Sequence, residues 1–280
     1  MNKMTYFEAQ KRASLCIEDK NLDKEVAKFL MMERFNLDNT HLLLHYRDEM
    51  DEKDLKQYFD DIDRYIDGYP PQYIIGKANF FGHEFYVDSN VLIPRPETEE
   101  LVEWVLSDHS SKNKRNVLDM GTGSGAIAIS LKIENNDWNV DAADISGGAL
   151  SVAKKNAKAN QIDVKFINSD LFKNIDKFYD VIVSNPPYVA DDELKYMDNS
   201  VIKYEPHEAL FAKNHGLFIY DRIADYIKSI SSNHHGDLYL EIGFKQKNAV
   251  VDIFSKKIPA ALITTRDDFY GNPRMVRVRY

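Results

Sequence analysis

The chain has 280 residues, 44% of them hydrophobic, so it can bury a full core and divide into a larger and a smaller domain. Its net charge of -9 argues against an extended nucleic-acid surface, which needs clustered Lys and Arg to displace counterions, but does not exclude a local one. The single cysteine, Cys16, excludes an internal disulfide framework, and no apolar run has the length of a signal-peptide core or a membrane span, so we expect a soluble cytoplasmic protein.

Residues 1–70 have the pattern of a small acidic helical bundle. The apolar residues between Leu55 and Ile66 recur at three- and four-residue intervals, which places them on one face of a helix. Asp51 is a candidate N-cap, and Gly68 with the prolines after it ends this helix. Two further helices are predicted, over Val26–Phe35 and Leu42–Leu44. The excess of acidic side chains suits a protein-docking module, while a cap that only shields the next domain stays an equal alternative.

A change of pattern follows this bundle. Aromatic and β-branched residues alternate with turn formers, which is typical of a β-hairpin. Pro96 can occupy the first turn of the next helix, and Glu97 suits the positive end of its dipole. Arg95 is a candidate for shaping a pocket, although a solvated charge is the default for any single Arg. The predicted division is a helical domain over 1–72, a hairpin linker over 73–95 and a main domain over 96–280.

The main domain alternates strands and helices, which indicates a doubly wound sheet. A short apolar strand ending at Met120 leads into Gly121-Thr122-Gly123-Ser124-Gly125 and then a helix. Glycines let the backbone approach a ligand, and the helix start points free N–H groups at it. Seven strands are predicted, over 117–120, 138–143, 164–167, 179–183, 238–242, 261–265 and 274–278, with helices over 217–230 and 245–254.

Two acidic residues follow the next strands at the same sheet edge. Asp144 lies about 20 residues beyond the glycines, where a carboxylate can bind ribose hydroxyls. Asp170 could accept from an adenine amine, with Leu171 and Phe172 against the ring, or could simply form a turn. These positions suit NAD as well as S-adenosylmethionine. However, the Gly-x-Gly-x-Gly spacing lacks the last interval of the dinucleotide fingerprint, which disfavours NAD.

The stretch Ser184-Asn185-Pro186-Pro187-Tyr188 follows the fourth strand of this domain. Consecutive prolines can neither donate to a sheet nor continue into a helix, so the chain forms a stiff turn. Its free carbonyls and the Asn185 amide offer acceptors at a fixed place, and Tyr188 offers a flat wall beside them. That arrangement suits a planar NH₂ group. Taken alone, the same stretch could be an ordinary proline-rich turn with a buried tyrosine.

Taken together, these motifs resemble the class I S-adenosylmethionine-dependent methyltransferases that modify planar nitrogen. Further segments resemble the peptide chain release factor glutamine N5-methyltransferases, the PrmC/HemK family: Gln72-Tyr73-Ile74-Ile75-Gly76, Leu92-Ile93-Pro94-Arg95-Pro96-Glu97-Thr98-Glu99 and Tyr204-Glu205-Pro206. The resemblance covers residues 72–280. The segment Phe211-Ala212-Lys213-Asn214-His215-Gly216 departs from the family's glycine-rich pattern.

This resemblance implies a seven-stranded Rossmann-like methyltransferase domain with an antiparallel last strand, preceded by a helical bundle and a hairpin. It implies methyl transfer from S-adenosylmethionine to the glutamine of the Gly-Gly-Gln motif of release factors, in support of translation termination. Three groups of residues are expected to carry this chemistry: catalytic Asn185, Pro186, Pro187 and Tyr188; cofactor-binding Gly121, Thr122, Gly123, Ser124, Gly125, Asp144, Asp170, Leu171 and Asn185; and substrate-binding Asn185, Pro186, Pro187, Tyr188, Arg95 and Glu97.

The hypothesis for the mechanism is direct transfer to an amide held by position. The Asn185 oxygen and the Pro186 carbonyl would accept from the two amide hydrogens, and Tyr188 would pack on the amide plane. Glu205 and His207 precede a helix and are candidates for ordering the substrate mouth, although for His207 alone the pattern favours a solvated loop residue.

Three other functions compete with this hypothesis. A DNA adenine or RNA guanine N-methyltransferase would use the same turn, a nucleotide-dependent oxidoreductase would bind NAD(P), and a ligand-binding scaffold would transfer nothing. We expect a monomer with no direct nucleic-acid substrate. We also expect no metal site, because no cysteine cluster or suitably placed Glu accompanies the i, i+4 pair His41 and His45.

Overall fold

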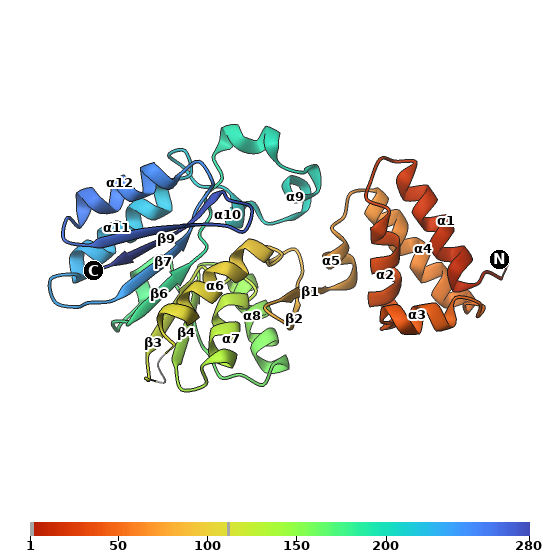
Figure 1. Cartoon of the computed structure of the whole chain (residues 1–280), viewed down its shortest axis with the longest axis horizontal. Coiled ribbons are helices and arrows are strands. Elements are labelled where there is room, and N and C mark those ends of the chain that lie inside the picture. The colour runs from red at the N-terminus through yellow and green to blue at the C-terminus, as the bar shows by residue number, and fades with distance from the viewer. Residues whose placement is uncertain (1–2, 111–112) are drawn as a thin grey trace. The chain divides into compact units, whose positions relative to one another are not determined.

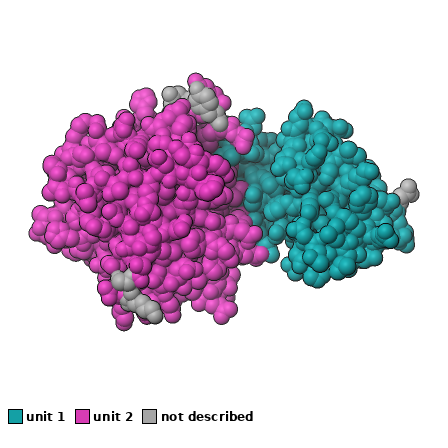
Figure 2. All heavy atoms as spheres, in the orientation of Figure 1, with its two compact units in different colours: residues 1–77, 199–204 teal, residues 78–198, 205–280 magenta. Residues whose placement is uncertain are grey.

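A computed structural model describes residues 3–110 and 113–280 of the chain. The chain divides into two compact units (Figure 2). The first contains the residues up to Lys77 together with a short excursion of the later chain, 199–204, and the second contains residues 78–198 and 205–280. Each unit has its own hydrophobic core.

The first unit is a bundle of helices (Figure 1). Its helices are α1 (Tyr6–Glu18), α2 (Glu25–Phe35), α3 (Asn39–His45), α4 (Glu52–Ile66), α5 (Pro71–Ile75) and α9 (Asn199–Tyr204). The predicted apolar face of α4 is confirmed, since Leu55, Tyr58 and Ile62 are buried. Asp51 is the N-cap residue, as predicted, although its side chain makes no capping hydrogen bond.

A buried ion pair joins two helices of this bundle. Arg34 of α2 donates from Nε to the carboxylate of Asp61 in α4 over 2.7 Å, and its guanidinium also donates to the Ile74 carbonyl over 3.0 Å. Asp61 has no exposed surface and accepts a further hydrogen bond from Gln57. The charge is therefore buried only because two helices supply donors to it.

The predicted hairpin is shorter than the sequence indicated. Its strands are β1 (Lys77–Phe80) and β2 (His83–Tyr86). The prediction of hairpin for residues 73–75 is wrong: Pro71 at the first position begins α5, which ends at Gly76 in the left-handed conformation with φ 80°. Aromatic and β-branched composition favours a strand, but the fixed φ of proline at a helix start outweighed it here.

The second unit is built on a seven-stranded sheet with the order β5-β4-β3-β6-β7-β9-β8. The first five strands pair in parallel, whereas β9 is antiparallel to both of its neighbours, which confirms the expected topology. The strands lie within two residues of most predicted bounds: β3 (Asn116–Met120), β4 (Asn139–Asp144), β5 (Lys165–Asn168), β6 (Val181–Ser184), β7 (Asp237–Glu241), β8 (Leu262–Asp267) and β9 (Pro273–Arg279).

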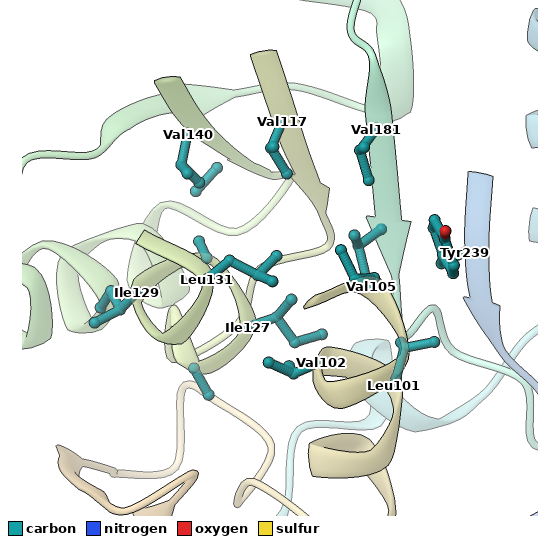
Figure 3. Packing of buried hydrophobic residues seen from close by; sticks show 14 of the residues in the cluster. Leu101, Val102, Val105, Val117, Ile127, Ile129, Leu131, Val140, Val181 and Tyr239 are labelled. Atoms are coloured by element: carbon teal, nitrogen blue, oxygen red, sulfur yellow. The ribbon is translucent and has the colours of Figure 1, made fainter. Parts of the chain in front are cut away.

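Helices cover both faces of this sheet (Figure 1). They are α6 (Pro96–Asp108), α7 (Ala126–Glu134), α8 (Gly147–Ala159), α11 (Phe218–Ile230) and α12 (Lys247–Lys257). The short helix α10 (His207–Leu210) and the 3₁₀ turns η1 (Leu171–Asn174) and η2 (Asp191–Tyr196) belong to the same unit. Side chains alternate across each strand, so Val117 packs with α6 and α7 (Figure 3), while Leu118 packs with α11 and α12.

The chain order reverses direction between β3 and β6. Strands β4 and β5 lie on one side of β3, and β6 and β7 lie on the other. In doubly wound sheets, ligands bind at such a switch point, outside the carboxyl ends of the strands. The glycine turn after β3 and the proline turn after β6 are both at this place.

Candidate active site

A cavity of about 830 Å³ opens at the switch point of the second unit. Its wall comes from the segments that follow β3, β4, β5 and β6, from the start of α6 and the segment before it, from residues 206–213 and from the start of α11. Of the residues expected to bind cofactor or substrate, the following line it: Arg95, Gly121, Thr122, Gly123, Ser124, Asp144, Asp170, Leu171, Asn185, Pro186 and Pro187. Gly125, Glu97 and Tyr188 do not line it.

The glycine turn is bound to a buried carboxylate of the preceding strand. Asp119 of β3 accepts from the Thr122 hydroxyl and from the backbone N–H of Ala128 over 3.1 Å. Burial raises the pKa of Asp119 to about 7, against those two hydrogen bonds. Gly125 has a positive φ of 83° and packs against Ala153 instead of facing the cavity. Sequence reasoning did not single out Asp119, although its place before the glycines was a usable signal.

Asp144 ties the glycine turn to the end of β4. Its two oxygens accept backbone hydrogen bonds from Gly123 over 2.9 Å and from Ser146 over 2.8 Å. Burial raises the pKa of this carboxyl, while the backbone donors lower it. Each carboxylate oxygen has a second lone pair, so the side chain can still accept from a ligand in the cavity.

Asp170 is paired with a basic residue that the sequence analysis did not single out. Arg222 of α11 donates to both of its oxygens, over 2.7 and 3.1 Å, and also lines the cavity. The hydrogen bond from Arg222 is the main cause that holds the pKa of Asp170 below its usual range. Leu171 lines the cavity next to this pair, whereas Phe172 stacks on Tyr226, with 3.6 Å between the ring centroids.

Asn185 follows β6 and has its amide nitrogen bound on one side. Its Nδ2 donates to Thr98 Oγ1 over 3.0 Å, and that hydroxyl donates to Glu241 Oε2 over 2.6 Å. Thr98 is in the first turn of α6, and Glu241 ends β7. Three elements that are distant in sequence therefore meet at one amide.

Glu241 is the buried centre of this network. The Tyr188 hydroxyl donates to its other oxygen over 3.3 Å, and the carboxylate is only 2% exposed. Burial raises the pKa of Glu241 to about 7, while the Thr98 hydrogen bond and the Arg274 charge act against this rise. Burial also raises the pKa of Tyr188, so the phenol stays a hydrogen-bond donor at neutral pH. Neither Thr98 nor Glu241 was predicted as a site residue.

A second carboxylate fixes the wall around Arg95. Glu205 is 3% exposed and accepts from the Arg95 guanidinium over 2.5 Å and from the backbone N–H of Ile93 over 3.3 Å. The segment before α6 is thereby held against the segment before α10. His207 begins α10, with its ring edge-on to Phe211.

The segment that departs from the family pattern is held by Gln246. Its Nε2 donates to the carbonyls of Tyr188 over 2.8 Å and of His215 over 3.3 Å. Gly216, with φ 78°, lies so close that a Cβ there would be 2.0 Å from the Tyr188 oxygen. The proline turn and the 211–216 segment are therefore packed together by a glycine and one amide.

Comparison with known proteins shows which family the chain belongs to. It is 44% identical to the release factor glutamine methyltransferase of Lactococcus lactis over 277 residues, covering 99% of this chain and all of the relative. It is 43% identical to that of Streptococcus pneumoniae, covering 91% of each chain. The chain belongs to the release factor glutamine methyltransferases.

Two family descriptions match separate parts of this methyltransferase. Residues 8–76 match the PrmC N-terminal domain, and residues 98–216 match the methyltransferase small domain. A solved methyltransferase from Pyrococcus furiosus, 18% identical, superposes with a TM-score of 0.53, covering 71% of this chain and 89% of that one. That likeness shows the class I methyltransferase fold.

Residues 3–110 and 113–280 contain neither a candidate membrane-spanning helix nor a candidate metal cluster. No helix there is long and apolar enough to cross a membrane. Nor do three His, Cys, Asp or Glu side chains gather there as they would around a metal ion. His41 and His45 each pair with an aspartate of their own, Asp38 and Asp48 respectively.

Proposed function

We propose that this chain transfers a methyl group from S-adenosylmethionine to the side-chain amide nitrogen of the glutamine in the Gly-Gly-Gln motif of peptide chain release factors, in the cytoplasm. Family membership supports the reaction class and the substrate. The observation that carries the proposal is the Asn185 amide at the cavity wall, whose nitrogen is bound to Thr98. Its oxygen would then accept from the substrate amide.

The residues around the cavity fit the proposed cofactor. The glycine turn leaves space for close backbone approach, since Cβ atoms added at Gly121 or Gly123 would meet nothing within 4 Å. Asp144 would accept from the ribose hydroxyls, and Asp170 with Leu171 would lie at the adenine. When bound, S-adenosylmethionine supplies an electrophilic methyl group on a sulfonium.

The proline turn would position the substrate amide. An amide nitrogen is a poor nucleophile because its lone pair is delocalised into the carbonyl. Asn185 Oδ1 and the Pro186 carbonyl would accept from its two hydrogens, which orients the nitrogen and favours the positive charge that develops on it. Tyr188, whose hydroxyl is bound to Glu241, would form the wall behind the turn.

Mass spectrometry tests this proposal directly. Release factor is incubated with the protein and S-adenosylmethionine, and the expected product carries one methyl group on the glutamine of the Gly-Gly-Gln motif. Addition to another residue type would overturn the substrate assignment. Transfer to DNA or RNA but not to release factor would favour the nucleic-acid alternative, and an NAD(P) heat of binding in calorimetry would favour the oxidoreductase.

A further inference from the structure

We propose that Thr98 and Glu241 are positioning residues that hold the Asn185 amide with its oxygen towards the cavity, and that ionised Glu241 is the state that does so. This inference rests on the proposed function, because it concerns the group that would receive the substrate amide. The chain of contacts runs from Asn185 Nδ2 to Thr98 Oγ1 over 3.0 Å, and from Thr98 Oγ1 to Glu241 Oε2 over 2.6 Å.

A hydroxyl has only one hydrogen, and this limits how the three groups can pair. When Glu241 is ionised, its oxygens can only accept, so the Thr98 hydrogen is committed to Glu241. The Thr98 oxygen can then only accept from Asn185, which places the amide nitrogen at Thr98 and the amide oxygen on the opposite side. A substrate N–H requires that acceptor.

A protonated Glu241 removes this restriction. Its proton can be donated to Thr98, whose own hydrogen is then free to be donated to Asn185. That pairing favours an Asn185 amide turned by 180°, with its NH₂ group towards the cavity. There it would face the NH₂ group of the substrate, and two donors cannot form a hydrogen bond. The protonation state of one buried carboxyl therefore selects between two orientations of the amide.

The surroundings of Glu241 place its change of protonation state near neutral pH. Burial raises its pKa to about 7. The charge of Arg274 from β9 and the hydroxyls of Thr98 and Tyr188 favour the ionised form, while the charge of Glu97 from α6 disfavours it. Tyr220 of α11 donates to the Glu241 backbone carbonyl over 2.8 Å, which fixes the end of β7. The ionised fraction, and with it the productive orientation, should increase as pH rises through about 7.

Substitutions at Thr98 distinguish a role in positioning Asn185 from a purely structural role. Thr98→Val keeps the shape but removes the hydroxyl, and we expect kcat to fall by about tenfold or more, equivalent to 1.4 kcal/mol of barrier, with little change in the Kd for S-adenosylmethionine. Thr98→Ser restores the hydroxyl and should recover most of kcat. Thr265→Val, on β8 and away from the cavity, is the matched control and should leave kcat unchanged.

The pH response tests Glu241. In the wild type, kcat should rise between pH 6 and 8, and the side-chain NH₂ signals of Asn185 in ¹⁵N NMR, identified by their loss in Asn185→Ala, should shift over the same range. Glu241→Gln cannot ionise, so both responses should disappear while cofactor still binds. If Glu241 had only a structural role, Glu241→Gln would lower the unfolding temperature, but kcat and the Asn185 signals would still change between pH 6 and 8.

The two proposals fail in different ways. If the wild type methylates no release factor, the proposed function is wrong, and the NMR titration without substrate still decides the orientation. If the wild type methylates release factor but Thr98→Val retains kcat within about twofold and the Asn185 signals do not titrate, the positioning inference is wrong. Should Thr98→Val fail to fold, Glu241→Gln and the wild-type titration provide the same decision.

Discussion

The Asn185 side chain donates from its nitrogen to Thr98, and we propose that its oxygen accepts from the substrate amide. We expect Asn185→Ala to lower kcat by about 10²-fold or more, the scale of a lost charge-stabilising group, because the substrate amide loses an acceptor. Calorimetry should show cofactor affinity largely kept. Asn139→Ala, at the opposite end of the sheet, is the control. Near wild-type turnover of Asn185→Ala would refute this role.

Gly216 packs directly against the proline turn. Gly216→Ala would impose a side chain at φ 78° and place its Cβ 2.0 Å from the Tyr188 oxygen. Gly271→Ala is a matched control, because its φ is 81° but nothing lies within 4 Å. We expect the conformational cost of about 1–2 kcal/mol in both, with a further steric cost of about 1–3 kcal/mol only at Gly216.

Thermal unfolding distinguishes these two variants. Gly216→Ala should lower the midpoint more than Gly271→Ala does, and it should also lower turnover, since the Tyr188 carbonyl would be displaced. Equal shifts in the unfolding midpoint would show that the 211–216 segment can move away from the Tyr188 oxygen without loss of stability. The segment would then be packed less tightly than the 2.0 Å contact indicates.

At the scale of elements, helices α2 and α4 are joined by the ion pair between Arg34 and Asp61. Arg34→Met would leave Asp61 buried without its ion partner, and such a change costs about 3–5 kcal/mol. Chemical denaturation should show this loss. Lys24→Met removes an exposed pair with Glu18 and is the matched control, for which we expect little change. Similar losses in both variants would mean that the Asp61 charge is compensated by other groups.

At the scale of the whole molecule, the net charge of -9 opposes binding to a phosphate backbone. We expect fluorescence anisotropy to detect no binding of a short labelled DNA duplex or RNA hairpin at physiological salt, under conditions in which release factor is methylated. The salt dependence of the release-factor reaction provides the control for surface electrostatics. Tight nucleic-acid binding with a steep salt dependence would contradict this prediction.

Local pattern was sufficient to predict most of the fold. Strand and helix periodicity, glycine and proline positions and the acidic ends of strands depend on neighbouring residues, and the strands from β3 to β9 lie close to the predicted ranges. The error at residues 73–75 arose where composition and a proline at a helix start disagreed. The two turns at the cavity could also be predicted, because parallel strands bring their carboxyl ends to one edge.

The sequence by itself determined the alternation of strands and helices, the glycine and proline turns and the family resemblance, because each depends on residues that are a few positions apart. Only the tertiary structure decided what completes the site. Thr98 and Glu241 are 143 positions apart, and Asp170 and Arg222 are 52 apart. Nothing in local spacing relates such residues. Thr98 and Glu241 meet where α6 and β7 bury their polar groups together, and the partly exposed Asp170 and Arg222 meet where the segment after β5 lies beside α11.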